Sequence, residues 1–436
     1  MSAFTAKAKW LSAHIVFFLL AGLVFPVLAP ASDLATGCCA DLESRIAELE
    51  ATAARKGNRA VSLQIYGQVN RALMIWDDGF ASDAYVVDNA TSSTRLGLIG
   101  RSQIEAGWHT GYRIEVEFDD APSDEVFNGP DGDDGVRTEE MLIRHAYLFV
   151  ESARLGRLSL GQQSQATDNI TIINLGARMS DAALHYNNNF GLRLDLDYGL
   201  TTDLTWGQFA HTVDSYRGDF LRYDTPAIHG FVLSSAIGED DIWDIALRYS
   251  GEWNSIRVAA GAGYMNDSEL DFEDVRGSFS AIHQPSGVYL SAAGGIRHDH
   301  SGAIGDGENA NFYFAQLGLQ RRFLPYGATS LYGEFGIYND FTVGSLLQAD
   351  IGPDRDLMTW GRIADSQVQR LGAGVEQSFD ASALLVYAQY HYYDAELLGN
   401  TCEYDADYAC TGFYDEAESL PVEPWSAVVL GGRIQF

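Results

Sequence analysis

Long apolar runs, basic residues and cysteines are all scarce in this sequence. Its one long apolar run, 15–28, has about 14 residues, whereas a membrane-spanning helix needs about 20. Lys and Arg together number 28 against 60 Asp and Glu, for a net charge of -32. Because binding to nucleic-acid phosphates needs a basic surface, these shortages exclude a helical membrane protein and argue against a nucleic-acid partner.

The apolar run belongs to an export signal. It follows Lys7 and Lys9 and leads into the A-P-A sequence at 29–31. A basic end, a short apolar core and a small-residue cleavage site describe a secretory signal peptide. We therefore assign residues 1–31 to a signal peptide and expect the mature chain to begin near Ser32.

The four cysteines include no C-x-x-C pair, so a zinc site has little support. Cys402 and Cys410 lie close together in a polar, acidic stretch. Export places them in an oxidising compartment, where we predict that they form a disulfide. Cys38 and Cys39 follow a sequence that only weakly resembles a lipidation site, and their state stays open.

Catalytic motifs are missing as well. The sequence has no G-x-S-x-G elbow, no H-E-x-x-H pair and no Walker loop. The H-D-H sequence at 298–300 is more typical of a polar loop than of a metal site. We expect no enzymatic activity, no bound metal and no cofactor.

A short helical segment follows the export signal. From Cys39 to Ala53, apolar residues recur at steps of three and four, as in a heptad seam with charged flanks. About two heptads are too few to be stable alone. We predict that residues 32–60 form a periplasmic coiled-coil segment supported by partner chains. A helix folded back on its own domain is the alternative.

From Ser62 onward the apolar residues recur with period two. Tyr112, Ile114 and Val116, for example, alternate with Arg113 and Glu115. Many of these segments reach about 10–12 residues, the length of a tilted strand that crosses a bilayer. Sixteen segments follow the pattern: 62–76, 93–102, 107–118, 140–151, 154–161, 218–225, 229–237, 243–251, 255–264, 274–282, 287–297, 311–322, 327–338, 366–378, 382–393 and 425–436.

The connections between these segments alternate between short and long, with 238–242 as a brief exception and 265–273 among the long ones. Tight periplasmic turns and long external loops are typical of an outer-membrane barrel. The sequence therefore predicts an all-β fold over 61–436, a 16-stranded antiparallel transmembrane β-barrel with both ends in the periplasm.

Acidic residues concentrate in two of the long connections. Residues 119–138 hold seven acids against Arg137 alone, and 394–423 hold nine with no Lys or Arg. Such loops are most simply solvated surface. The alternative is a Ca²⁺ or Mg²⁺ role, in which the loops bridge to lipopolysaccharide phosphates.

The chain also ends on a strand. Val428, Leu430, Gly432, Ile434 and the terminal Phe436 share one face. The barrel assembly machinery favours such an end, so we expect it as a partner.

Four stretches resemble the Gram-negative general porins, especially those of the α-proteobacterial type. ADLESRIAELEATAARKGNRAVSL (40–63) is similar to a coiled-coil prefix, and STRLGLIGRSQI (93–104) to a second strand and its turn. GRLSLGQQSQATDNI (156–170) resembles a fifth strand that enters a constriction loop, and FLRYDTPAIHGFVLSSAIGED (220–240) resembles strands six and seven. The resemblance covers about 39–436. It implies a 16-stranded barrel, a homotrimer and a third external loop folded into the lumen.

The resemblance also implies arginines on the lumen wall that face carboxylates on the inward loop. Arg95 and Arg144 fall on the family's wall arginines of strands two and four, and Arg217 or Arg222 fits that of strand six. Period two alone places Arg95 and Arg113 in the lumen, since their strand neighbours are apolar. A charge on the lipid face would cost about 2–4 kcal/mol at mid-bilayer. Alternatively, some of these arginines lie near a rim in ordinary ion pairs.

The inward loop is expected at 162–217. It lacks the Pro-Glu-Phe-Gly-Gly signature of enteric porins, and Asp168 and Asp181 are the candidate carboxylates. Residues 192–200 alternate like a strand, and a strand pair there would raise the count to eighteen. Arg71 shares its face with apolar residues, which predicts either a bulge or a subunit interface.

These features predict an integral outer-membrane porin for passive diffusion of small hydrophilic solutes and ions, with selectivity set by pore width and lining charge. One alternative is a channel selective for sugars or carboxylates, and the lumen tyrosines Tyr332, Tyr338 and Tyr387 leave it open. Another is a structural or adhesive surface protein. Expected partners are outer-membrane lipid, lipopolysaccharide and, through the prefix, peptidoglycan.

Overall fold

A computed structural model describes residues 61–436, apart from 119, 129–134, 137–140, 181, 183–189, 195–200, 215, 240, 301–308, 351–356 and 405–409. The predicted signal peptide, the predicted coiled-coil segment and Cys38 and Cys39 lie outside the described residues. Within those residues, no helix combines the length and apolar character needed to cross a membrane.

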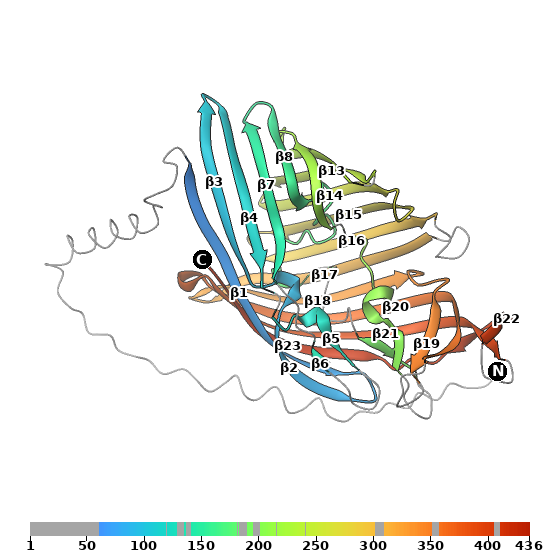
Figure 1. Cartoon of the computed structure of the whole chain (residues 1–436). Helices are drawn as coiled ribbons and strands as arrows, with labels where there is room; N and C mark the ends of the chain where they lie inside the picture. The colour runs from blue at the N-terminus through green and yellow to red at the C-terminus, as the bar shows by residue number, and fades with distance from the viewer. Residues whose placement is uncertain are drawn as a thin grey trace. The chain divides into compact units, whose positions relative to one another are not determined.

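Sixteen strands of the described chain close into an antiparallel barrel (Figure 1). They are β1 (Ser62–Asp77), β3 (Arg95–Glu105), β4 (Trp108–Glu117), β7 (Leu142–Ser152), β8 (Gly156–Ser164), β11 (Arg217–Asp224), β12 (Phe231–Gly238), β13 (Trp243–Trp253), β14 (Ile256–Asp267), β15 (Phe272–His283), β16 (Val288–Asp299), β17 (Asn309–Leu324), β18 (Gly327–Asn339), β20 (Leu357–Phe379), β21 (Leu384–Tyr404) and β23 (Trp425–Gln435). Each corresponds to one predicted segment.

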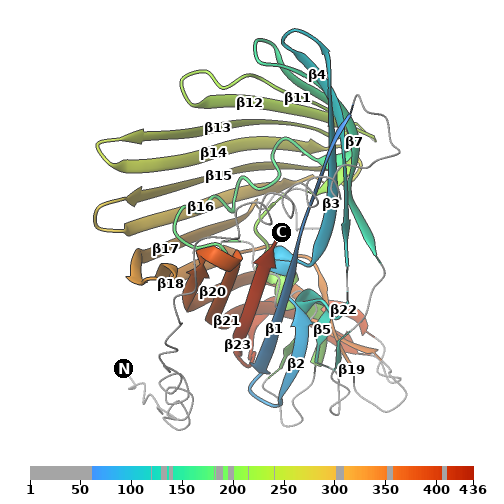
Figure 2. The ribbon, with the colours of Figure 1, turned by 90° about the vertical axis from the view of Figure 1, so that its left-hand side faces the viewer.

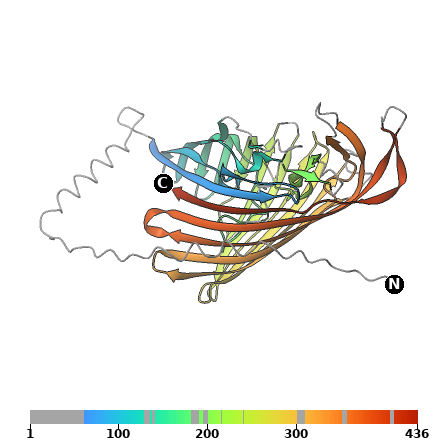
Figure 3. The same ribbon diagram turned by 90° about the horizontal axis from the view of Figure 1, so that it is seen from below.

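The barrel closes through its first and last strands. β1 pairs antiparallel with β23 from Gln68↔Gln435 to Asp77↔Ser426. Figure 3 shows blue β1 against red β23, and Figure 2 shows the long strands β12–β16 running side by side along one wall. The ring confirms the predicted sixteen-stranded barrel.

Period two separates the two faces of the wall. Leu96 and Ile114 on the outer face are 40% and 43% exposed, whereas Glu115 on the inner face is 2% exposed. This distribution of apolar and polar side chains is the reverse of that in a soluble protein. It follows because apolar side chains face lipid and polar side chains face the lumen.

Connections at the two ends of the barrel differ in length. At one end they are tight, as at Asn254 and Ser255, which both have positive φ (48° and 64°), as in two-residue hairpin turns. The barrel's first and last strands also start and finish at this end. At the other end, the predicted long connection 265–273 is wrong, because β14 and β15 extend until only 268–271 join them.

Further strands lie outside the ring. β2 (Ser82–Asp88), β19 (Leu346–Asp350) and β22 (Cys410–Leu420) extend β1, β20 and β21, and β5 (Val126–Phe127) pairs with β6 (Gly135–Val136). A disulfide joins Cys402 on β21 to Cys410 on β22. β9 (Gly191–Arg193) pairs with β10 (Thr201–Thr205), which precedes α2 (Trp206–Phe209). Neither β9 nor β10 enters the ring, so the alternative count of eighteen is wrong.

Arg71 lies on the outer face of β1. Its register with β2 and β23 is continuous, which removes the bulge as an explanation. Its guanidinium lies 3.0 Å from the Asp120 carboxylate and 3.7 Å from that of Asp88. The charge is therefore paired where it faces outward.

Candidate functional site

The described residues of the connection between β8 and β11 (165–216) fold into the barrel and follow its inner wall. The backbone N–H and the hydroxyl of Thr167 both donate to Asp244 on β13, at 2.6 and 2.7 Å. Leu175 N–H donates to Ser280 on β15, and Met179 N–H donates to Glu376 on β20, both at 2.9 Å. The loop is thus fixed to strands that follow it in the chain by as many as 210 residues.

The later part of this loop packs an aromatic core against β1, β21 and β23. The rings of Trp76 and Phe190 lie 5.0 Å apart, and those of Phe190 and Trp425 lie 5.2 Å apart. Tyr393 packs at 5.3 Å from Trp425, and Trp206 of α2 packs at 6.1 Å from Tyr393. These buried rings fill the lumen at the end of the barrel where Trp76 and Trp425 lie, so the open space is lined mainly by β3, β4, β7, β8 and β11.

An ion pair fixes this core to the loop after β1. Arg193 on β9 donates to the Asp78 carboxylate at 2.8 and 3.0 Å, and Asn128 donates to it at 2.8 Å. Burial acts to raise the pKa of Asp78, but the hydrogen bond from Ala81, together with Asn128 and Arg193, outweighs it and leaves the pKa below its usual range. The carboxylate is therefore charged at neutral pH, although it is 1% exposed.

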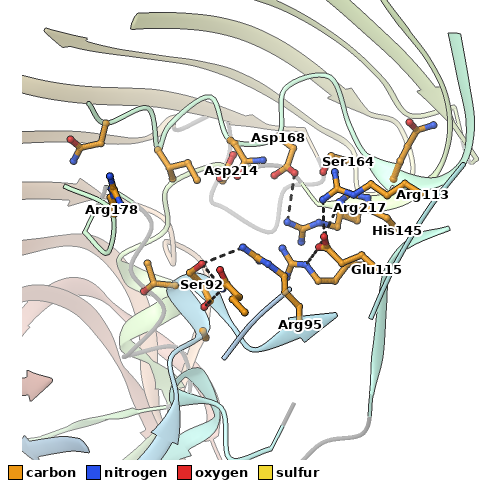
Figure 4. A pocket seen from close by; sticks show the side chains of 18 of the residues that line it. Ser92, Arg95, Arg113, Glu115, His145, Ser164, Asp168, Arg178, Asp214 and Arg217 are labelled. Atoms are coloured by element: carbon orange, nitrogen blue, oxygen red, sulfur yellow. Dashed lines mark hydrogen bonds and ion pairs between the residues drawn. The ribbon is translucent and has the colours of Figure 1, made fainter. Parts of the chain in front are cut away.

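A cavity of 1120 Å³ remains between the loop and the wall (Figure 4). All five predicted wall arginines line it, together with Asp168. Among the described residues, its lining carries eight arginines and four carboxylates: Arg95, Arg113, Arg144, Arg157, Arg178, Arg217, Arg222, Arg248, Glu115, Asp168, Asp214 and Asp224. The described lining of this cavity thus carries net positive charge, although the chain is strongly acidic.

The carboxylates that pair with Arg113 and Arg144 come from the wall itself. Glu115 accepts from Arg113 at 2.7 Å and from Arg144 at 2.8 Å, and Arg144 also donates to Glu117 at 2.5 Å. Tyr66 donates to the same Glu115 at 2.6 Å. These contacts form a ladder of alternating charge along β4 and β7, rather than the wall-to-loop pairs that the resemblance implies.

The loop contributes Asp168, which is 5% exposed and lies 3.8 Å from the Arg217 guanidinium. Arg222 instead pairs with Asp224 at 2.8 Å and donates to the backbone oxygen of Gln165 at 2.9 Å. Both candidates for strand six therefore reach the cavity: Arg217 pairs with the loop acid, and Arg222 holds the start of the loop. The second candidate acid, Asp181, lies outside the described residues.

Arg95 has a different environment. Its guanidinium donates to the Ser92 hydroxyl at 3.2 Å, and within the part of the chain that the structure describes no carboxylate oxygen lies within 4.0 Å of it. Figure 4 shows it pointing into the cavity beside this contact.

Several arginines at the lumen were missed by the sequence analysis. The alternation that places Val428 and Leu430 on the outer face of β23 places Arg433 on its inner face. The same alternation in β8 and β13 would have placed Arg157 and Arg248 in the lumen. Arg178 lies on the inward loop, where no period exists to predict its direction.

The tyrosines that left a sugar channel open do not reach the cavity. Tyr332, Tyr338 and Tyr387 are 6%, 1% and 2% exposed, and Tyr332 and Tyr338 contact the inward loop or the side chains that anchor it. The phenol rings that line the cavity, among the described residues, are Tyr66 and Tyr147. The described lining therefore carries no row of rings on which a sugar would stack.

Among the described residues, no group of three or more His, Cys, Asp or Glu side chains is arranged to hold a metal ion. His298 contacts Asn309, and His300 lies 4.0 Å from Glu273.

The family model described as Gram-negative porin matches residues 38–398. No curated protein matches the sequence significantly. Two solved structures of OmpT, an outer membrane protein of Vibrio cholerae, one a loop L8 deletion mutant and one described as a trimer form, each align at 15% identity with a TM-score of 0.50. Each alignment covers 86% of this chain and 100% of that chain, and likeness at this identity shows the fold alone.

Proposed function

The chain belongs to the Gram-negative porin family, and we propose that its channel passes small hydrophilic anions in preference to cations. The protein is an integral outer-membrane β-barrel that forms a water-filled channel. Family and fold are those of a channel, and we propose that it works by passive diffusion, without catalysis.

The excess of arginines over carboxylates on the cavity lining carries the anion preference. Charges that line a narrow passage with low-dielectric walls concentrate ions of the opposite sign. The acidic loops of the chain act much less on the constriction, because salt screens exposed charges beyond about 8–10 Å. The lining therefore outweighs the net charge of -32.

The test is the reversal potential across a planar bilayer under a KCl gradient. We expect chloride to be more permeant than potassium, and we expect Arg95→Ala with Arg144→Ala to lower the chloride-to-potassium permeability ratio by about threefold or more. Arg154→Ala, in the exposed turn between β7 and β8, is the matched control. A potassium preference in the unaltered channel would refute the proposal.

The same recording addresses the adhesive alternative, which predicts folded protein without conductance. Stepwise current from folded protein supports the porin.

We also propose a homotrimer. The similar Vibrio cholerae structure is described as a trimer, and the outward-facing pair of Arg71 and Asp120 suits a contact between subunits better than lipid. Cross-linking of purified protein tests this: a trimeric band supports it and a monomer alone contradicts it. The predicted coiled-coil segment 32–60 would support the same trimer.

We propose three further partners. The acidic outer loops would contact lipopolysaccharide through Ca²⁺ or Mg²⁺, the prefix would approach peptidoglycan, and the barrel assembly machinery would insert the chain.

A further inference from the structure

Three N–H donors converge on the hydroxyl of Ser92, the last residue of the short 3-10 turn Ala90–Ser92 between β2 and β3. Gln68 donates to it at 2.9 Å, Arg95 at 3.2 Å and Arg433 at 3.1 Å. A hydroxyl has two acceptor lone pairs and no charge. Two guanidinium groups thus lie within two hydrogen-bond lengths of each other and share a neutral acceptor that cannot satisfy every donor.

Carboxylates do not balance this pair of arginines. Within the described residues, no carboxylate oxygen lies within 4.0 Å of either guanidinium. Glu115 and Glu117 attract Arg95, but both already pair with the wall arginines. Glu376 attracts Arg433, and its oxygens accept from the loop backbone at 2.9–3.1 Å.

A third arginine adds to the positive charge. Arg178 on the inward loop lines the same cavity as Ser92 and Arg95, and it repels Arg433 electrostatically. Figure 4 shows Arg178 and Ser92 away from the cluster of Arg113, Arg217 and Glu115. Arg178 and Ser92 therefore lie apart from the charge ladder of β4 and β7, and Arg95 lies between Ser92 and that ladder.

Buried polar atoms around Ser92 also lack partners. The hydroxyls of Thr91 and Ser93 and the Nε of Arg433 are buried without a hydrogen-bond partner in the described chain. Ser93 is 3% exposed and Arg433 is 8% exposed. Leaving such groups unpaired is unfavourable, and a bound group with several acceptor oxygens would offer partners to the Thr91 hydroxyl, which lines the cavity, and to the donors beside it.

We propose that Ser92, Arg95, Arg178 and Arg433 form a binding site for a doubly charged oxyanion, either free phosphate or the phosphate group of a small solute. Such a group has enough acceptor oxygens for several guanidinium and hydroxyl donors, and two negative charges to match the excess arginines. Chloride offers one charge and no directional acceptors. The inference rests on the proposed anion channel and names the solute class that the channel slows and selects.

The experiment is single-channel recording of the full chain in KCl at pH 7.5 and constant ionic strength, with added potassium phosphate. Phosphate should lower the chloride current in a saturable manner. Arg178→Gln with Arg433→Gln should raise the half-blocking concentration about tenfold. Arg154→Gln, the same substitution in an exposed turn, should leave it unchanged.

Three further measurements separate the outcomes. In the first, glycerol phosphate replaces inorganic phosphate in the recording. If both compounds block the chloride current, phosphate esters are among the ligands. If only inorganic phosphate blocks it, the ligand is the free ion. Calorimetric titration of folded protein in detergent with phosphate measures binding without transport. If the double variant does not fold, Ser92→Ala should still weaken block about threefold, because the hydroxyl orients both guanidinium groups.

An unsaturable phosphate effect, or equal half-blocking concentrations in the unaltered and double-variant channels, would overturn the site. Chloride preference without phosphate block would defeat this inference and leave the anion channel intact. Potassium preference would defeat the anion channel itself.

Discussion

Glu115 decides the charge balance of the lumen wall at the scale of single residues. It is 2% exposed and accepts from Tyr66, Arg113 and Arg144. Its position was readable from the sequence, since Ile114 and Val116 face outward, but its pairing was not. Alternation gives the face of a side chain, whereas contacts across strands depend on register.

Glu115→Gln should therefore change both selectivity and stability. Removing one negative charge leaves Arg113 and Arg144 less balanced, so we expect a higher chloride-to-potassium permeability ratio. The free energy of unfolding should fall by about 2 kcal/mol, because charged hydrogen bonds are lost at a buried site. Reversal potentials and urea unfolding in detergent measure the two effects.

Glu105→Gln is the matched control, because Glu105 is exposed at the end of β3. An unchanged permeability ratio in Glu115→Gln would show that the ladder does not act on permeating ions.

The inward loop is the element that sets the position of the passage. Period two predicted all sixteen ring strands, because each strand repeats the rule independently along about ten residues. The path of the loop could not be predicted in this way. It depends on single contacts between distant residues, such as Met179 with Glu376, and no local pattern marks them.

The ion pair between Asp78 and Arg193 should make this element sensitive to acid. The pKa of Asp78 is lowered in the folded protein, so the stabilisation is present above the unfolded value of about 3.9. It is lost as the pH falls through the lower folded value. We expect the protection of residues 190–194 and 201–209 against hydrogen exchange, corrected for the intrinsic exchange rate, to fall from about pH 4 downward, as measured by mass spectrometry.

Asp78→Asn should show fast exchange in this segment at neutral pH and little further acceleration in acid. Equal exchange in the two proteins at pH 7 would mean that the aromatic core alone holds the loop.

At the scale of the whole molecule, the ring depends on pairing between β1 and β23. Phe436 lies next to the closing strand and exchanges two backbone hydrogen bonds with Gly67, at 3.1 and 3.0 Å. Both strands were predicted from the sequence. That they pair with each other followed only from the even number of strands and from the closure that a barrel requires.

Deleting Phe436 should slow closure, because it removes both backbone bonds at the seam. We expect the folded fraction after a fixed refolding time in detergent to fall about threefold, measured as the heat-modifiable band on a gel. Phe436→Tyr keeps the backbone and should fold normally. Equal yields for the deletion and the unaltered chain would show that the seam needs only β23.

The seam between β1 and β23 also has a consequence for biogenesis. Strands some 360 residues apart must meet, and contacts of such long range form slowly. Until the final segment arrives, the sheet has two open edges with unpaired N–H and C=O groups, which are templates for aggregation. We therefore expect a nascent chain with an apolar outer face and open edges to need a chaperone during its transit of the periplasm, and a prematurely terminated chain to be degraded.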